Sequence, residues 1–161
     1  MLDYEDARAL VFKNVIPLEK SLCPIAESQG LALSTDVLAP YGIPLFDNSA
    51  VDGYAVQAAD LSDASMENPV RLKKLGYISA GDSGEERIVS GQCIQIATGA
   101  PLPRGADTTV MKEDIELEDS NVLFFQAIPK SENIRFYGED IVEGQTVIPL
   151  GTVIGPAQLA V

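Results

Sequence analysis

Histidine and tryptophan are absent from the 161-residue sequence, and basic residues are scarce. Eleven Lys and Arg stand against 24 Asp and Glu, so the formal net charge is −13 at neutral pH. Without histidine there can be no Ser-His-Asp or Cys-His catalytic group and no imidazole-ligated metal site. Nucleic acids and anionic lipid surfaces repel a chain this acidic, so neither is an expected partner. The chemistry that remains belongs to carboxylates, hydroxyls, backbone amides or pure binding.

Only two cysteines occur, Cys23 and Cys93, and each lies in an apolar stretch. Two buried free thiols are the simpler interpretation and a disulfide is the alternative; free thiols suit a reducing cytoplasm. Residues 1–6 have neither the basic region nor the apolar core of a signal peptide. No apolar run approaches the ~18 residues needed to span a bilayer. The expectation is a cytoplasmic protein that does not associate with a membrane.

Helical periodicity is confined to the start of the chain. Residues 3–14 carry apolar residues at helical spacing, with acids at the N-terminal end and Pro17 as the stop. A second short helix is predicted at residues 24–29, with Gly30 as its left-handed cap. Beyond residue 31 the sequence breaks into short β-type runs between turn residues: 33–38, 70–78, 92–97, 108–112, 122–127, 146–148 and 152–154. This pattern predicts a mainly β fold, a barrel or bent sheet, with a few short helices.

Two of these regions carry expectations about burial. In residues 92–96 the alternation places Cys93 and Gln95 on one side and the two isoleucines on the other, which predicts a half-buried strand. Residues 113–119 alternate acidic and aliphatic side chains. That alternation is more typical of a solvated edge strand that resists aggregation than of an ion site. The polar stretches 59–68 and 81–86 are predicted loops.

The segment 44–55 is dense in polar groups and leads into a β-type run. Its pairs Asp47-Asn48 and Asp52-Gly53 are turn formers whose side chains can bond their own backbone. A structural turn is therefore one interpretation. The other is that the turn holds Asp52 outward as a metal ligand or proton acceptor.

The segment 97–107 follows a predicted strand and is rich in small residues and proline. Small side chains allow a ligand or another backbone to approach the amides of Gly99 and Ala100, and Thr98 offers a hydroxyl to an oxyanion. The segment lacks the spacing and the lysine of a phosphate-binding P-loop. A proline-stiffened crossover between strands is the alternative.

The third segment, 133–144, ends in a short acidic stretch. If the backbone is extended, Glu139 and Asp140 point to opposite faces, so only one of them faces a given site. Arg135 is one of the few cations and a natural partner for a neighbouring acid. A solvated acidic turn is the alternative to a site.

Together these segments resemble the N-terminal region of the MoeA family, the molybdopterin molybdenumtransferases, which include the gephyrin E domain. The resemblance covers nearly the whole chain and is most specific at residues 46–55, at residues 96–107 and at Gly138-Glu139-Asp140. The departures are Val51, where Met is usual, Thr108-Thr109, and Phe136-Tyr137, where a more basic pair is common. Family members also continue past this C-terminus into a domain that binds the pterin phosphate and the nucleotide.

The resemblance implies two β-rich domains. A discontinuous dimerisation domain is expected from residues 1–45 and 136–161, with helix 3–14 packing on a domain beyond this chain. Residues 46–135 are expected to form an inserted, barrel-like domain. The implied partners are a second copy in a homodimer and the pterin-binding domain of the same or the partner subunit.

The resemblance also implies a reaction, the last step of molybdenum cofactor assembly. Molybdate is inserted into adenylylated molybdopterin with help from Mg²⁺, and AMP is released. The residues that match the family's sensitive positions are the implied catalytic groups, the two acids also being the implied Mg²⁺ ligands: Asp52, Thr98 and Asp140. Ser49, Gly99 and Ala100 are implied in cofactor binding.

The charge of the chain suggests a division of labour. Molybdopterin, AMP and molybdate are anions, and a chain at −13 cannot hold them alone at useful affinity. We therefore expect the isolated chain to be inactive and its site to be completed by another domain. Two other classes remain open. One is a dimerisation or interaction module with no catalytic role, and the other is a small-molecule-binding barrel, which the 6% aromatic content disfavours.

Overall fold

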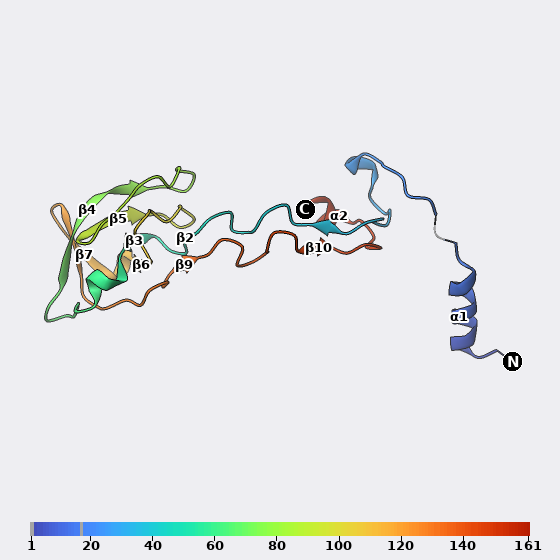
Figure 1. Cartoon of the computed structure of the whole chain (residues 1–161), viewed down its shortest axis with the longest axis horizontal. Coiled ribbons are helices and arrows are strands. Elements are labelled where there is room, and N and C mark those ends of the chain that lie inside the picture. The colour runs from blue at the N-terminus through green and yellow to red at the C-terminus, as the bar shows by residue number, and fades with distance from the viewer. Residues whose placement is uncertain (1, 17) are drawn as a thin grey trace. The chain divides into compact units, whose positions relative to one another are not determined.

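A computed structural model describes residues 2–16 and 18–161 of the chain (Figure 1). The chain divides into two compact units, Met1–Val37 with Thr146–Val161 and Leu38–Gln145. The expected domain boundaries, after residue 45 and after residue 135, both lie inside the larger unit, and the assignment of dimerisation to the smaller one stays a prediction. The predicted mainly β class with short helices is confirmed.

The smaller unit begins with helix α1 (Tyr4–Asn14). Asp3 caps the helix, because its side chain accepts a hydrogen bond of 2.8 Å from the amide of Asp6. The helix predicted at 3–14 is therefore confirmed, whereas its predicted stop, Pro17, lies outside the described residues. No residue of α1 is buried among the described residues, and its apolar side chains are exposed.

The rest of the smaller unit contains little regular structure. The helix predicted at 24–29 is a 3₁₀ turn, η1 (Ile25–Glu27), and Gly30 follows with a φ of +84°, as its capping role requires. Of the run predicted at 33–38, only strand β1 (Val37–Leu38) forms, and it pairs with β10 (Thr146–Ile148). The run predicted at 152–154 forms no strand, and its Val153 makes an isolated bridge with Ala32. Helix α2 (Pro156–Leu159) follows. None of the helices in the described part of the chain is long and apolar enough to cross a membrane.

The larger unit is built on a six-stranded sheet that curls on itself, in the order β6-β3-β5-β4-β8-β7 (Figure 1). All neighbouring strands are antiparallel except β4 and β5. The six strands are β3 (Gly53–Val56), β4 (Val70–Ile78), β5 (Gln92–Ile96), β6 (Thr108–Met111), β7 (Ile115–Glu118) and β8 (Asn121–Phe124). Residues 115–118 of the acidic and aliphatic run form β7 at the sheet edge, as predicted, whereas Glu113 and Asp114 at its start lie in a 3₁₀ helix. The 3₁₀ helices η2 (Ala58–Leu61) and η3 (Lys112–Asp114) interrupt the connections.

Both faces of this sheet are covered by apolar side chains. Strand β5 runs between the two clusters, with Cys93 in one cluster and Ile94 and Ile96 in the other. None of these three residues is more than 4% exposed. The prediction that residues 92–96 form a half-buried strand is therefore wrong. Strand β5 lies between β3 and β4 and has an apolar cluster against each face, so Cys93 is covered as fully as the two isoleucines, while Gln92 and Gln95 are only partly buried.

Both cysteines are free, as predicted, but only Cys93 is buried. The prediction that Cys23 is buried is wrong, because the segment around it is not packed and the side chains of Leu22 and Ile25 are exposed as well. Burial raises the pKa of the Cys93 thiol to about 12. This thiol therefore stays protonated and unreactive at neutral pH.

Candidate functional site

Strand β2 (Asn48–Ser49) brings two of the predicted segments together. On one side it pairs with β9 (Ile134–Arg135), as Figure 1 shows. In this pairing Asn48 lies opposite Arg135. On its other side Asn48 forms a bridge with Pro101. Because adjacent strands are about 4.8 Å apart, the backbones of Arg135 and Pro101 lie roughly 10 Å apart across β2.

Asp52 lies in the bend between β2 and β3 with its carboxylate half exposed. Its Oδ1 accepts two hydrogen bonds of 2.9 Å from Thr98, one from the amide and one from the hydroxyl. Its Oδ2 accepts from Nζ of Lys112 at 3.2 Å. These donors, the Thr98 amide above all, hold the pKa of Asp52 at about 2. The carboxylate is therefore ionised at any physiological pH.

A close approach of strands β3 and β6 places Lys112 beside Asp52. A Cβ on Gly53 would lie 2.0 Å from the carbonyl oxygen of Val110, so only glycine allows β3 and β6 to meet at this point. The amide of Lys112 donates to the carbonyl of Asp52 at 3.1 Å. A backbone hydrogen bond and a side-chain ion pair therefore both hold Lys112 beside Asp52.

The turn at residues 97–100 aims Thr98 at Asp52. Gly99 has a φ of +78°, and its amide donates to the carbonyl of Ser49 at 2.8 Å. The amide of Ala100 donates to Ala97 at 3.0 Å. Neither amide is open to a ligand, which differs from the expected cradle for an oxyanion. The hydroxyl and amide of Thr98 likewise bind Asp52, and a place for Ser49, Gly99 and Ala100 in cofactor binding stays a prediction.

Asp140 belongs to a second ionic cluster, in the turn after β9. The guanidinium of Arg135 donates from Nη2 to Oδ2 of Asp140 and from Nε to Oε1 of Glu139, the latter at 2.8 Å. The amide of Phe136 donates to Oε2 of Glu139, also at 2.8 Å. The hydrogen bond from Arg135, followed by the one from Phe136, lowers the pKa of Glu139.

This geometry corrects one expectation and confirms another. Glu139 and Asp140 do not point to opposite faces, because the backbone after β9 turns instead of staying extended, and one guanidinium contacts both carboxylates. The predicted pairing of Arg135 with a neighbouring acid is confirmed, and the guanidinium pairs with a second acid as well.

The two clusters are separate, and the described residues do not fit a metal ion by themselves. No ion pair among residues 2–16 and 18–161 joins Asp52 or Lys112 to the cluster of Arg135. Nor does this part of the chain gather three His, Cys, Asp or Glu side chains that could hold a metal. Asp52 and Asp140 each face a cation of the chain already. A Mg²⁺ site here would need ligands from elsewhere.

The sequence motifs do not include Lys112. It is 60 residues from Asp52, and only the pairing of β6 with β3 brings the two side chains together. Its position at the end of a predicted strand was visible in the sequence, but the partner of that strand was not. The Ala-Thr-Gly-Ala turn likewise gave no sign that Thr98 faces Asp52.

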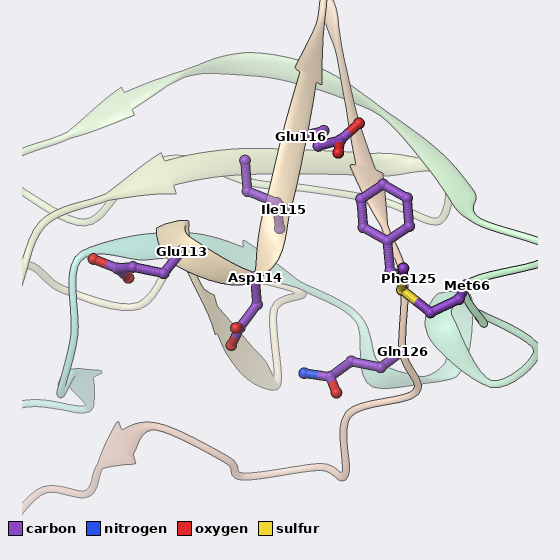
Figure 2. A pocket seen from close by; sticks show the side chains of 7 residues that line it. All are labelled: Met66, Glu113, Asp114, Ile115, Glu116, Phe125 and Gln126. Carbon is purple, nitrogen blue, oxygen red and sulfur yellow. The ribbon is translucent and has the colours of Figure 1, made fainter.

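An open groove of about 390 Å³ is lined in part by residues 113–116, which directly follow Lys112 in the sequence. Figure 2 shows Met66 beside Phe125 on one side, with Glu113 and Asp114 projecting from η3 on the other. Glu116 of β7 also lines it. None of the three carboxylates takes part in an ion pair within the described residues. The groove therefore repels anions, and unlike the two clusters it contains no cation.

Comparison with known proteins gives consistent matches over nearly the whole chain. A family model of the MoeA N-terminal region (domain I and II) matches residues 2–161. Molybdopterin molybdenumtransferase 2 of Mycobacterium tuberculosis is 40% identical over 136 residues, which are 84% of this chain and 34% of that protein. Molybdopterin molybdenumtransferase of Haemophilus influenzae is 32% identical over 161 residues, 99% of this chain and 39% of that protein.

A solved structure has the same fold. The crystal structure of the molybdopterin biosynthesis moeA protein from Pyrococcus horikoshii OT3 matches with a TM-score of 0.89 and 31% identity. The match covers 99% of this chain and 42% of that one. The chain thus spans between 34% and 42% of the length of these relatives.

Proposed function

This chain belongs to the MoeA family, whose N-terminal region it matches, and from this premise we propose that it forms one side of a molybdenum insertase site. The reaction is the insertion of molybdate into adenylylated molybdopterin with release of AMP. The relatives are named for molybdenum transfer to molybdopterin, which supports a role in molybdenum cofactor biosynthesis. The substrates, the reaction and the homodimer of the whole protein are part of the proposal, as is its cytoplasmic location.

The carboxylate of Asp52 is the observation that carries this proposal. A residue that only forms a turn bonds its own backbone nearby, whereas the donors to Asp52 lie 46 and 60 residues away along the chain. They hold the group fixed yet leave 53% of it exposed. A charged group held in one orientation at the surface is suited to meet a ligand brought by another domain.

The low pKa decides what Asp52 does there. A carboxylate with a pKa of about 2 is a weak proton acceptor at neutral pH, because efficient general bases have pKa values near the working pH. Its proposed role is therefore electrostatic. The fixed negative charge of Asp52 orients a charged ligand at the edge of the site by repelling the negative groups of that ligand, and Thr98 holds the carboxylate in place. Asp140, oriented by Arg135, has the same role in the second cluster.

The substrates of the proposed reaction are anions, which need basic side chains to bind them. The two basic side chains nearest the proposed acids, Lys112 and Arg135, are both ion-paired. The remaining domain of the enzyme, on the same or the partner subunit, therefore supplies the binding of pterin phosphate and nucleotide. In this division Ser49, Gly99 and Ala100 hold the backbone that places Thr98 against Asp52. The isolated chain is expected to have no turnover.

The roles proposed for Asp52, Thr98 and Asp140 do not depend on bound Mg²⁺. The described residues do not fit the ion alone, and each proposed ligand already binds a basic side chain. Mg²⁺ at Asp52 or Asp140 is compatible with the proposal only if the other domain adds oxygen ligands.

The test is the turnover of Asp52→Asn in the full-length enzyme. The amide has the shape of the carboxylate but no charge, so we expect turnover to fall by about tenfold or more with the dimer intact. Glu116→Gln is the matched control, because it removes an exposed acid that has no ion-pair partner among the described residues. Normal molybdenum insertion by Asp52→Asn would refute the assignment.

One observation favours a second candidate, an interaction module without a catalytic role. Helix α1 exposes Tyr4, Val11 and Phe12, and none of its residues is buried. Such an apolar face is typical of a protein contact. This candidate predicts a stable dimer by sedimentation and no effect of Asp52→Asn on function.

A further inference from the structure

Strand β7 has one open edge. It is the last strand of the six-stranded sheet, and among residues 2–16 and 18–161 it pairs only with β8. In the same part of the chain, Ile115–Glu118 form no backbone hydrogen bond with any other segment. The N–H and C=O groups on the outer side of β7 therefore lack a strand partner, and an edge of this kind can pair with a further strand.

We propose that the open edge of β7 binds an extended segment of another protein chain, in which Lys or Arg alternates with apolar residues. The segment adds a strand to the sheet, so that its backbone provides affinity and its side chains provide specificity. The open edge takes no part in the proposed reaction at Asp52. The inference therefore goes beyond the proposed function and does not rest on it.

Apolar surface lies along the open edge. Leu117 of β7 is 63% exposed, and the groove at the start of β7 (Figure 2) is lined by Met66, which is 74% exposed, and by the half-buried ring of Phe125. A flexible methionine adapts to side chains of different shapes. Ile115 packs against the core and so fixes the backbone at the start of the edge. An added strand would thus meet a rigid edge with apolar side chains to bury.

The register of β7 against β8 sets the pattern that an added strand must have. Leu117 lies opposite Val122, which is fully buried in the core, so Leu117 is on the core face of the sheet. Glu116 and Glu118 are on the other face, because side chains alternate along a strand. A matching strand therefore carries apolar residues on the core face and basic residues on the outer face.

The protein already makes one such contact on the outer face. Nη2 of Arg71 in β4 lies 2.6 Å from Oε2 of Glu118, although β8 runs between β4 and β7. Glu116, Glu113 and Asp114 have no ion-pair partner in the described part of the chain. Charge complementarity at the open edge therefore favours a basic partner.

The same acids disfavour a second copy of this chain as the partner. In an antiparallel register that keeps the apolar side chains on one face, Leu117 would lie opposite its own copy and Glu116 opposite Glu118. Like charges directly opposite each other destabilise a pair of strands. The edge is thus protected against self-association and remains open to a strand of opposite charge.

The experiment measures binding of a fluorescein-labelled peptide of alternating Lys and Val to this chain by fluorescence anisotropy. Glu116→Lys replaces an attraction by a repulsion, and we expect it to raise the dissociation constant about tenfold. Glu27→Lys is the matched control, because it gives the same change in net charge at an exposed acid of η1 that has no ion-pair partner among the described residues. It should change the dissociation constant by less than about twofold.

A second peptide separates strand pairing from charge alone. Proline in place of valine keeps every lysine but removes the N–H groups that a strand needs, so we expect binding to weaken about tenfold or more. The inference is overturned if the unchanged chain does not bind the Lys-Val peptide, if both peptides bind alike, or if Glu116→Lys and Glu27→Lys weaken binding equally. A dimer of the chain that dissociates when the Lys-Val peptide is added, seen by sedimentation, would assign the edge to a second copy and would also overturn it.

Discussion

Thr98 donates its amide and its hydroxyl to the same oxygen of Asp52, each at 2.9 Å, across 46 residues of sequence. Two donors on one oxygen fix the orientation of a carboxylate more strictly than one does. The bond links the turn after β5 to the bend before β3, two neighbouring strands of the sheet. The site geometry is therefore a property of the sheet and not of a free loop.

Removal of the Thr98 hydroxyl should raise the pKa of Asp52. In Thr98→Val the backbone donor and Lys112 remain, so we expect a pKa above 2 but still below the ordinary value of 3.8. Carbon-13 NMR of the side-chain carboxyl measures it directly. Thr98→Ser retains a hydroxyl and should keep the low value. An identical pKa in Thr98→Val would show that the hydroxyl does not bind the carboxylate.

Asp52 should also make folding stability depend on pH. Its pKa is about 2 in the folded chain and 3.8 when unfolded, so the unfolded chain binds more protons between these values. The stabilisation is complete above pH 3.8 and is lost as the pH falls toward 2. Urea unfolding of the unchanged chain and of Asp52→Asn should give a difference that shrinks over this window. A difference that stays constant from pH 5 to pH 2 would contradict the assigned pKa.

Gly53→Ala should destabilise the larger unit. The added Cβ would lie 2.0 Å from the carbonyl oxygen of Val110, so β3 and β6 must move apart at a cost of about 1–3 kcal/mol. Gly76→Ala in β4 is the matched control, because nothing lies within 4 Å of the Cβ it adds. Urea unfolding followed by circular dichroism compares the two. Equal stability of both variants would mean that the strands do not approach as described.

The two thiols should differ in reactivity. Cys23 is exposed, whereas Cys93 is buried with a pKa of about 12. We expect a water-soluble disulfide reagent at pH 8 to modify one thiol of the native chain quickly and the second only in denaturant. Cys23→Ser should abolish the fast phase. Rapid modification of both thiols in the native chain would contradict the packing of β5.

Much of the fold was predictable because it depends on local patterns. The capping Asp3 and the helical spacing after it defined α1, and β-type runs between turn residues gave most strands of the larger unit. The burial of β5 was not predictable, since alternation at Gln92–Ile96 does not show that two neighbouring strands and a second apolar cluster cover both faces.

The candidate site was predictable only in part. Asp52, Thr98 and Asp140 were identified through resemblance, and the structure brings the first two into direct contact. Lys112 was missed because its contact with Asp52 depends on the register of β3 against β6, which no local pattern encodes. The joint pairing of Glu139 and Asp140 with Arg135 was missed because a turn, and not an extended strand, follows β9.

In the proposed function Thr98 acts on the reaction by holding Asp52, and a double-mutant cycle in the full-length enzyme distinguishes this role from an independent one. Turnover is measured for Asp52→Asn, Thr98→Val and the combination. We expect each single change to lower turnover and Thr98→Val to have little further effect once Asp52 is Asn. If the two losses simply multiply, Thr98 and Asp52 act independently and the role proposed for Thr98 is wrong.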